Sequence, residues 1–428
     1  MKIRFLLPLL LCIAVSLKAQ RFDDFFVDRT LRVDYTFSGD NRHQQISVDE
    51  LLCSEGWYGR RANLDSLLLR GNGQLTMTDT LGRDTLYRHS FSTLFQEWQT
   101  TEEATHVWKS FENVFLLPMP KQPVLVTVTL TDTHNRVVES LTHRVNPDDI
   151  LIRPIGRKQT PWRYLGQSGD SRQRIDIAFV PEGYRQDEME RFYDDCRESI
   201  DAMLSHEPFR SMADHFNFVA VAMPSDESGV SIPHRGEWRS TALSSAFDTF
   251  YSERYLTTLH LKRLHDILAG IPYEHIIILA NTDNYGGGGI YNSYLMSAAH
   301  NAKSRPVVVH EFGHSFAGLA DEYYNDDTFE EFYHADTEPW EPNITTLKDF
   351  SQKWADMLPP DTKIPTQPDG RDIYTQVGVY EGAGYQSKGV YRPVQECRMK
   401  INEAPVFCPV CERAIRRMIL YSTGEAEK

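Results

Sequence analysis

The sequence predicts an α/β (α+β) layered domain preceded by an antiparallel β-sandwich. Three observations support this fold class: period-two alternation of polar and apolar residues in the first third, buried strands alternating with amphipathic helices after about residue 170, and a helix with closely spaced histidines. We therefore divide the chain into four ranges: a signal peptide (1–19), an N-terminal β-sandwich domain (20–150), a linker (151–170) and a catalytic domain (171–428).

The composition is that of a folded protein with two domains. The chain has 428 residues, of which 41% are hydrophobic and 25% are charged, so a large core can form. The formal net charge of −15 argues against a nucleic-acid partner or an anionic membrane surface, because phosphate recognition needs a basic face.

The first residues have the pattern of a secretory signal peptide. Lys2 and Arg4 precede an apolar run from Phe5 to Leu17, and Ala19 is a small residue at the expected cleavage site. A membrane span needs about 20 apolar residues, which neither this run nor any later one reaches. We expect a protein that is secreted, periplasmic or on the cell surface.

The predicted sandwich contains alternating runs separated by Gly, Asn and Asp turn signals. The clearest runs are residues 31–37, 74–81 and 124–132. No catalytic cluster is visible in this part of the chain. Its expected role is contact with a surface or a glycan.

The second domain alternates buried strands with helices. We predict strands at 174–184, 216–225 and 275–282, and helices at 187–209, 241–270 and 412–421. The four glycines of residues 286–289 predict an edge strand beside a cleft, or alternatively a surface turn.

The segment HEFGHSFAGLADEYY carries the candidate chemistry. His310 and His314 are four residues apart, so on a helix they share one face and can both reach one zinc ion. Glu311 follows the first histidine, where its carboxylate can take a proton from the water that zinc activates. The pattern predicts one catalytic Zn²⁺ ion.

A third ligand is needed, because a catalytic zinc site has three protein ligands and an open position. Gly318 is placed to end the helix and turn the chain back, which brings Asp321 to the metal. Glu322 is the competing ligand, or else an acceptor that holds a ligand imidazole. Two later glutamates are further rivals for the third position: Glu330 and Glu331.

These residues resemble the metzincin zinc peptidases, with Ala317 at the usual glycine position and Asp321 one residue later than the usual third ligand. The chain is more similar to the IgA peptidase family of secreted bacterial metallopeptidases, in HEFGHSFAGLADEYY and in CRMKINEAPVFCPVC. That resemblance implies a β-rich domain before a zinc metallopeptidase domain. It also implies hydrolysis of an extracellular protein, with immunoglobulin A as the candidate substrate.

The resemblance to the metzincins implies further roles near the C-terminus. Met399 corresponds to the methionine that lies under the zinc ligands, and the alternative is an ordinary core methionine. Tyr385 and Tyr391, in a Gly-rich and Tyr-rich interval, are candidate stabilisers of the oxyanion of the tetrahedral intermediate.

Three cysteines lie close together at the C-terminal end, at positions 397, 408 and 411. A disulfide from Cys397 to Cys408 or Cys411 suits an oxidising compartment and is our prediction. A structural zinc site would need a fourth ligand that the neighbouring sequence does not show, and a redox C-x-x-C lacks its usual context.

A different class of function also fits part of the pattern. The chain could be a non-catalytic surface protein or glycan-binding protein with a structural or dormant zinc site. Glu311 argues against that alternative, because a purely structural site has no use for a carboxylate beside its water.

Overall fold

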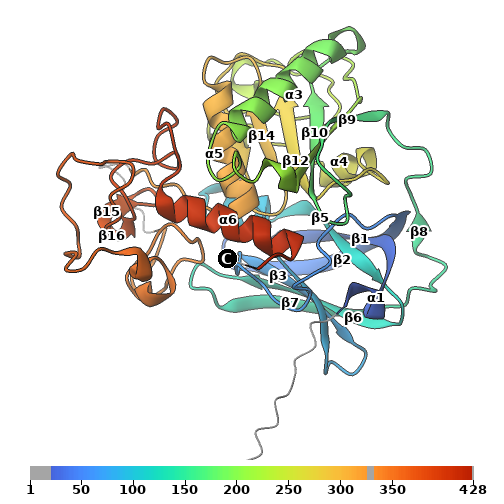
Figure 1. The fold of residues 1–428 in the computed structure, drawn as a ribbon. Helices are drawn as coiled ribbons and strands as arrows, with labels where there is room; N and C mark the ends of the chain where they lie inside the picture. Colours follow the sequence, from blue (N-terminus) through green and yellow to red (C-terminus); the bar gives the residue numbers. More distant parts are fainter. Residues whose placement is uncertain (1–20, 325–331, 427–428) are drawn as a thin grey trace, which may run out of the picture.

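The computed structural model describes residues 21–324 and 332–426. The first part of the chain, up to about residue 154, consists of two β-sheets (Figure 1). The predicted signal peptide lies outside the described residues. The first sheet has the order β5-β1-β2-β8 and the second the order β4-β3-β6-β7. The strands are β1 (Phe26–Gly39), β2 (Gln44–Glu55), β3 (Gly73–Asp79), β4 (Thr85–Phe91), β5 (Lys109–Pro120), β6 (Val124–Thr131), β7 (Val137–Val145) and β8 (Arg153–Pro154). Two short helices accompany them: α1 (Phe22–Phe25) and α2 (Leu94–Trp98).

The two sheets face each other across an aromatic core. The ring centroids of Phe91 on β4 and Phe115 on β5 are 4.3 Å apart, and those of Phe26 on β1 and Tyr87 on β4 are 6.4 Å apart. Along β3 and β6 buried residues alternate with half-buried ones, as the period of two predicts. The predicted β-rich N-terminal part is confirmed.

The second part is built on a six-stranded sheet with the order β13-β14-β12-β10-β11-β9. The four inner strands are parallel and the two edge strands are antiparallel to their neighbours. The strands are β9 (Trp162–Gln167), β10 (Ile175–Glu182), β11 (Phe216–Val221), β12 (His275–Ala280), β13 (Gly287–Gly289) and β14 (Leu295–Ala298). The helices are α3 (Met189–Leu204), α4 (Leu261–Ile267), α5 (Ser304–Ala317) and α6 (Pro409–Thr423), and a hairpin of β15 (Tyr380–Ala383) and β16 (Gln386–Arg392) precedes α6. No described helix has both the length and the apolar character needed to cross a membrane.

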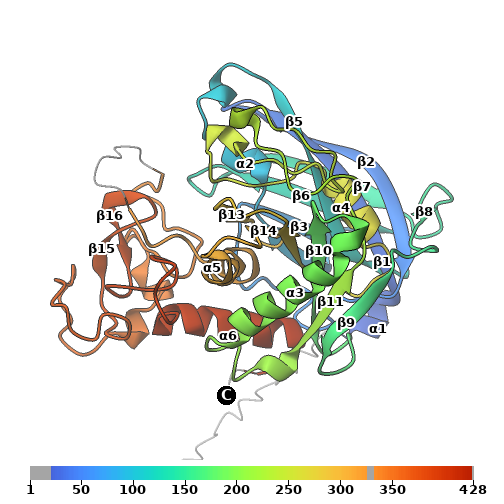
Figure 2. The same cartoon turned by 90° about the horizontal axis from the view of Figure 1, so that it is seen from above.

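The six-stranded sheet is buried on both faces. Ile177 and Phe179 of β10 belong to the core that α3, α5 and α6 also line. Ala178 and Val180 point the other way, into the core that contains the residues of the N-terminal sheets. Figure 2 shows α3 and α6 on one side of this sheet and β1 and β2 on the other. The N-terminal sheets therefore cover the face that these helices leave open.

The segment predicted as a linker takes part in both sheets. β8 pairs in parallel with β2, with Leu52 opposite Arg153, and β9 forms the edge of the six-stranded sheet beside β11. The residues between 151 and 170 thus add a strand to each part. The domain boundaries themselves stay a prediction.

The helix predicted over residues 241–270 is wrong for most of its length. Only Leu261–Ile267 forms an α-helix there. The buried carboxylate of Glu182, at the end of β10, accepts hydrogen bonds from the backbone N–H groups of Leu243 and Ser245, both at 2.9 Å. Because these donors bind a distant side chain, the loop follows tertiary contacts and not its local helix propensity.

The glycine run forms the predicted edge strand. A Cβ atom on Gly289 would lie 2.4 Å from the carbonyl oxygen of Glu311 and 3.1 Å from the Cβ of His314. β13 therefore lies against the backbone of α5 at a distance that only glycine permits.

The substitution Gly289→Ala should lower the free energy of unfolding by about 1–3 kcal/mol, the usual cost of overpacking a filled site. Urea unfolding would measure it. Gly169→Ala is the matched control, since the three atoms nearest to its new Cβ all belong to the flexible side chain of Arg174, at 3.1 Å at the closest. Equal unfolding midpoints for the two variants would show that β13 can move away from α5.

Candidate metal centre

Helix α5 carries the two histidines on the face opposite its apolar residues. Val308, Phe312 and Phe316 are buried in the core beneath the sheet. His310 and His314 each follow one of these residues, Val308 and Phe312, by two positions. Two positions correspond to about 200° around a helix, so the histidine side chains project from the opposite face.

The helix ends as expected at Ala317. Gly318 is left-handed, with φ 59° and ψ 31°. The chain then turns back toward the histidines.

Three donor atoms converge at the end of this turn. The Nε2 atom of His310 lies 3.0 Å from the Nε2 of His314 and 3.0 Å from the Oδ1 of Asp321. The Nε2 of His314 lies 3.2 Å from the same oxygen. Donors around a tetrahedral zinc ion with bonds of 2.0–2.1 Å are about 3.3 Å apart. The spacing of the three atoms therefore fits one shared metal ion.

The hydrogen bonds of the imidazoles support the same conclusion. The Nδ1 of His310 lies 2.9 Å from the carbonyl oxygen of Arg398, and the Nδ1 of His314 lies 2.6 Å from that of Leu319. A carbonyl only accepts, so each Nδ1 carries the proton and each Nε2 presents a lone pair. Two lone pairs and a carboxylate oxygen directed at one point repel each other unless a proton or a metal cation lies among them. Metal-ligating histidines have this arrangement.

The electrostatics of the site favour positive charge. Burial lowers the pKa of His314, but the Asp321 carboxylate outweighs burial and raises that pKa to about 9. Burial raises the pKa of Asp321, yet the two histidines hold it well below its usual range. Burial also raises the pKa of Glu311, while His310 and His314 oppose the shift.

Asn343 fixes the turn that presents Asp321. Its side chain accepts from the backbone N–H of Ala320 at 2.7 Å and donates to the carbonyl of Ala320 at 2.9 Å. It also donates to Oε1 of Glu322 at 2.9 Å. Neighbouring side chains of an extended segment point to opposite sides, so Glu322 points away from the histidines.

Glu322 therefore is neither the third ligand beside the histidines nor an acceptor that holds a ligand imidazole. Its Oε1 contacts the thiol of Cys411 at 3.2 Å and no ligand imidazole. The imidazole of His310 is held instead by the carbonyl of Arg398. Glu330 and Glu331, the other rival ligands, lie outside the described residues.

Tyr385 reaches the site from the turn of the β15–β16 hairpin. The backbone N–H of Gly384 donates to the carbonyl of Asp321 at 2.9 Å, and that of Tyr385 donates to the carbonyl of Tyr323 at 3.0 Å. This pairing places the Tyr385 hydroxyl so that it donates to Oδ2 of Asp321. Tyr391 is half-buried on β16, and no described contact joins it to the three candidate ligands.

Comparison with known families agrees with this geometry. A family model described as IgA Peptidase M64 matches residues 164–373 and 369–419, and another, described as Peptidase M64 N-terminus, matches residues 21–142. The chain belongs to the IgA peptidase M64 family. It is therefore a metallopeptidase, a hydrolase that acts on a protein substrate. None of the curated proteins compared with the chain matches it.

The matched ranges of this M64 peptidase contain the whole candidate site. Helix α5 and Asp321 lie in the first range, and Tyr385 and Met399 lie in the second. The resemblance seen in the two sequence motifs is confirmed.

Met399 packs directly on the helix that carries the histidines. A Cβ on Gly313 would lie 2.7 Å from the Met399 sulfur, and the methionine side chain is fully buried. The carbonyl of Met399 also accepts from the backbone N–H of Glu322 at 2.8 Å. The segment around Met399 thus contacts both α5 and the turn that presents Asp321.

The three C-terminal cysteines of the peptidase are close together but are not paired. Cys397, Cys408 and Cys411 are free and buried, and the sulfur atoms of Cys397 and Cys411 are 3.8 Å apart. The structure differs from the predicted disulfide because the three sulfur atoms and the Glu322 carboxylate gather around one point.

The N-terminal part contributes a carboxylate that the sequence did not single out. Glu97 at the end of α2 accepts a hydrogen bond from the Tyr255 hydroxyl at 2.6 Å. Loss of hydration among the surrounding groups raises the pKa of Glu97 to about 7, although the residue is exposed. The charge of His314 lowers this pKa, and the charge of Glu311 raises it. No local motif marks this residue, since it approaches the site only through the packing of the two parts.

A separate cavity of about 120 Å³ lies between the N-terminal sheets and the second part. Its lining includes His89, Phe115, Glu274, His275 and Tyr291, and none of the three candidate metal ligands. It therefore plays no part in the metal centre.

The Tyr385→Phe substitution should weaken metal binding about 10- to 100-fold, because Asp321 loses the donor that orients it. Competition with a chromophoric chelator would measure the affinity. Tyr391→Phe removes the same hydroxyl from the neighbouring strand and should leave metal binding unchanged. Equal affinities for the two variants would contradict an orienting role for Tyr385.

Proposed function

We propose that this peptidase is a zinc-dependent endopeptidase with a metzincin-like site that acts outside the cytoplasm. The ligands are His310, His314 and Asp321, and the general base is Glu311. The observation that carries this proposal is the convergence of two lone-pair-bearing Nε2 atoms and one carboxylate oxygen, with both Nδ1 protons donated to carbonyls.

The donor set favours zinc. Two imidazole nitrogens and one carboxylate oxygen leave a fourth position free, which is the pattern of catalytic zinc sites and not of structural ones. When bound, zinc would polarise the scissile carbonyl and lower the pKa of a water molecule.

Glu311 is positioned to move the proton. It follows His310 directly on α5, it is half-buried, and within the described part of the chain its carboxylate accepts no hydrogen bond. A free carboxylate there can take the proton from the attacking water and deliver it to the leaving amine.

Two further residues have supporting roles in the proposal. Met399 forms an apolar floor, which the contact of its sulfur with Gly313 supports. Tyr385 orients Asp321 with its hydroxyl proton, and of the two tyrosines it is the one whose hydroxyl contacts a candidate ligand. To donate to the oxyanion of the tetrahedral intermediate, that proton would have to leave Asp321.

The family suggests a first substrate to test, and the N-terminus suggests a cellular location. The family description names immunoglobulin A, which is the first substrate to test. Residues 1–19 act as a signal peptide in this proposal, so the enzyme meets its substrate outside the cytoplasm. The N-terminal β-rich part contacts a surface, a glycan or the substrate itself.

The direct test is incubation of the zinc-loaded protein with immunoglobulin A, immunoglobulin G and casein. Mass spectrometry of the products should show internal cleavage that a chelator stops and added zinc restores. Release of single terminal residues would replace the endopeptidase with an exopeptidase. A fully zinc-loaded protein that cleaves none of the three would contradict the proposal and favour a binding protein.

A further inference from the structure

A second group of metal-binding side chains lies on the other side of the turn that presents Asp321. It consists of Glu322, which follows Asp321 directly, and three cysteines from the C-terminal region: Cys397, Cys408 and Cys411. All four side chains are buried, and Glu322 and the three cysteines each have a relative exposure of 0%. We call these four residues the cysteine cluster.

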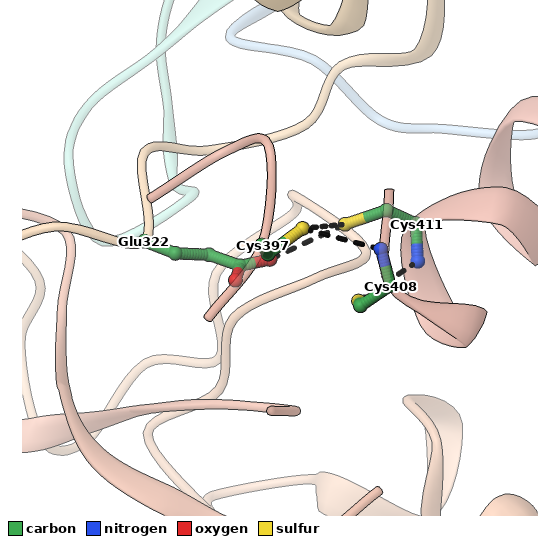
Figure 3. Close-up of side chains that lie close together, drawn as sticks. All are labelled: Glu322, Cys397, Cys408 and Cys411. Atoms are coloured by element: carbon green, nitrogen blue, oxygen red, sulfur yellow. Dashed lines mark hydrogen bonds between the residues drawn. The ribbon is translucent and has the colours of Figure 1, made fainter. Parts of the chain in front are cut away.

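The donor atoms of the cysteine cluster have the spacing of a tetrahedral site. The sulfur atoms of Cys397 and Cys411 are 3.8 Å apart, and the sulfur of Cys411 is 3.2 Å from Oε1 of Glu322 (Figure 3). Two thiolates bound to one zinc ion at about 2.3 Å are roughly 3.8 Å apart. One donor atom from each residue lies within 4.8 Å of the others.

Backbone groups prepare the sulfur atoms to carry negative charge. The backbone N–H of Cys408 donates to the sulfur of Cys397 at 3.3 Å, and that of Cys411 donates to the sulfur of Cys408 at 3.5 Å. Cys408 is also the N-cap of α6, a helix of 15 residues, whose positive end favours a thiolate. Hydrogen bonds from backbone N–H groups and the positive end of a helix both stabilise thiolates, which is the form in which cysteine binds metals.

No basic side chain neutralises the cluster by a direct ion pair among the described residues. Arg392 acts on Glu322 at a distance, but it donates its hydrogen bonds to the carbonyls of Glu381 and Gly382. The second carboxylate oxygen of Glu322, Oε2, is buried without a hydrogen-bond partner. Without a cation beside it, a carboxylate in this position would have to take up a proton, so a bound metal ion would compensate its burial.

We propose that Glu322, Cys397, Cys408 and Cys411 bind a structural zinc ion. Thiolates select soft metals such as zinc, and four protein donors fill a tetrahedral site completely. This site has no open position, unlike the candidate catalytic centre with its three ligands.

The zinc ion would join the segments that build the catalytic centre. Glu322 adjoins the ligand Asp321, and its backbone N–H donates to the carbonyl of Met399. Cys397 precedes Arg398, whose carbonyl orients the imidazole of His310. The ion would therefore hold the segments of Glu322 and Cys397 and the start of α6 together. In this way it would help to orient the residues that bind the catalytic metal.

The first test uses the wild-type protein and needs no variant. Metal analysis should find two zinc ions per chain. Replacement by Co²⁺ should give the intense near-ultraviolet absorption of sulfur-to-cobalt charge transfer, which the histidine–aspartate site cannot produce. One ion per chain and no such absorption would overturn the proposal. So would peptide mapping of unreduced protein that finds two of the three cysteines joined in a disulfide.

The second test assigns each ion to its site. His310→Ala/His314→Ala should keep one ion and the sulfur-to-cobalt absorption, and Cys408→Ser/Cys411→Ser should keep one ion and lose that absorption. Cys196→Ser, a buried free cysteine on α3, is the matched control and should keep both ions. If the cysteine variant does not fold, the histidine variant and the wild-type spectrum still decide.

The ion count of the histidine variant distinguishes a missing cysteine site from a missing catalytic centre. A single ion that the histidine variant loses would overturn the cysteine site and leave the proposed mechanism in place. A single ion that the histidine variant keeps, with sulfur-to-cobalt absorption, would do the reverse.

Discussion

Replacing Glu311 with glutamine is expected to lower kcat about 10²- to 10⁴-fold while the protein keeps its metal. Glutamine has the same shape but cannot take a proton from water. The two histidines and Asp321 are untouched, so metal binding should not change. Steady-state kinetics on a cleaved substrate, together with metal analysis of the same sample, would measure both effects.

The control for this prediction is the same chemical change on the surface. Glu198 on α3 forms an exposed ion pair with Arg305, which contributes little to stability, so Glu198→Gln should have wild-type activity. If Glu311→Gln were as active as Glu198→Gln, another group would have to serve as the base.

Replacing Asp321 with alanine should weaken zinc binding at the catalytic centre by more than about 100-fold. Loss of an outer-shell partner alone costs about 10- to 100-fold in metal affinity. Asp321 supplies a carboxylate oxygen 3.0 Å from the Nε2 of His310 and 3.2 Å from that of His314. The affinity should be followed by chelator competition under conditions in which any second ion stays bound.

Two comparison variants make the assignment of the third ligand decisive. Glu330→Ala and Glu331→Ala remove the rival carboxylates and should bind zinc as tightly as the wild type. Retention of zinc by Asp321→Ala, with loss in either of these variants, would move the third ligand to the later segment.

The parts of the site that were predicted from the sequence are those that local geometry determines. The spacing of His310 and His314 sets their common face on any helix. Gly318 ends the helix in the left-handed conformation that was expected, and the turn brings Asp321 back to the histidines. These features lie within twelve consecutive positions, from 310 to 321, so no tertiary information is needed to connect them.

The features that could not be predicted depend on contacts between distant segments. Nothing in the sequence distinguishes Tyr385 from Tyr391 until the hairpin turn pairs with the segment after Asp321. The carbonyl of Arg398 that orients His310 leaves no sequence signal, because every residue has a carbonyl. Glu322 is 75 positions before the first cysteine that it meets, which is why the fourth ligand of that cluster was not visible.

The same reason explains the error in the second part of the fold. The apolar spacing over residues 241–270 suggested a helix, but Glu182 from β10 takes the backbone N–H groups of Leu243 and Ser245. A strand that comes before this loop in the chain thus decides the shape of the loop. Helix propensity alone could not predict the shape of this loop, because it carries no information on where the Glu182 side chain points.

The shared interior of the two parts has a consequence for how the protein melts. Val180, Val219 and Ile278 of the six-stranded sheet are buried together with the aromatic residues of the N-terminal sheets. A fragment that starts near residue 160 would leave these aliphatic side chains in water and should precipitate. We therefore expect differential scanning calorimetry of the intact protein to record a single cooperative endotherm. Such a result would mean that the catalytic part needs the N-terminal sheets in order to fold.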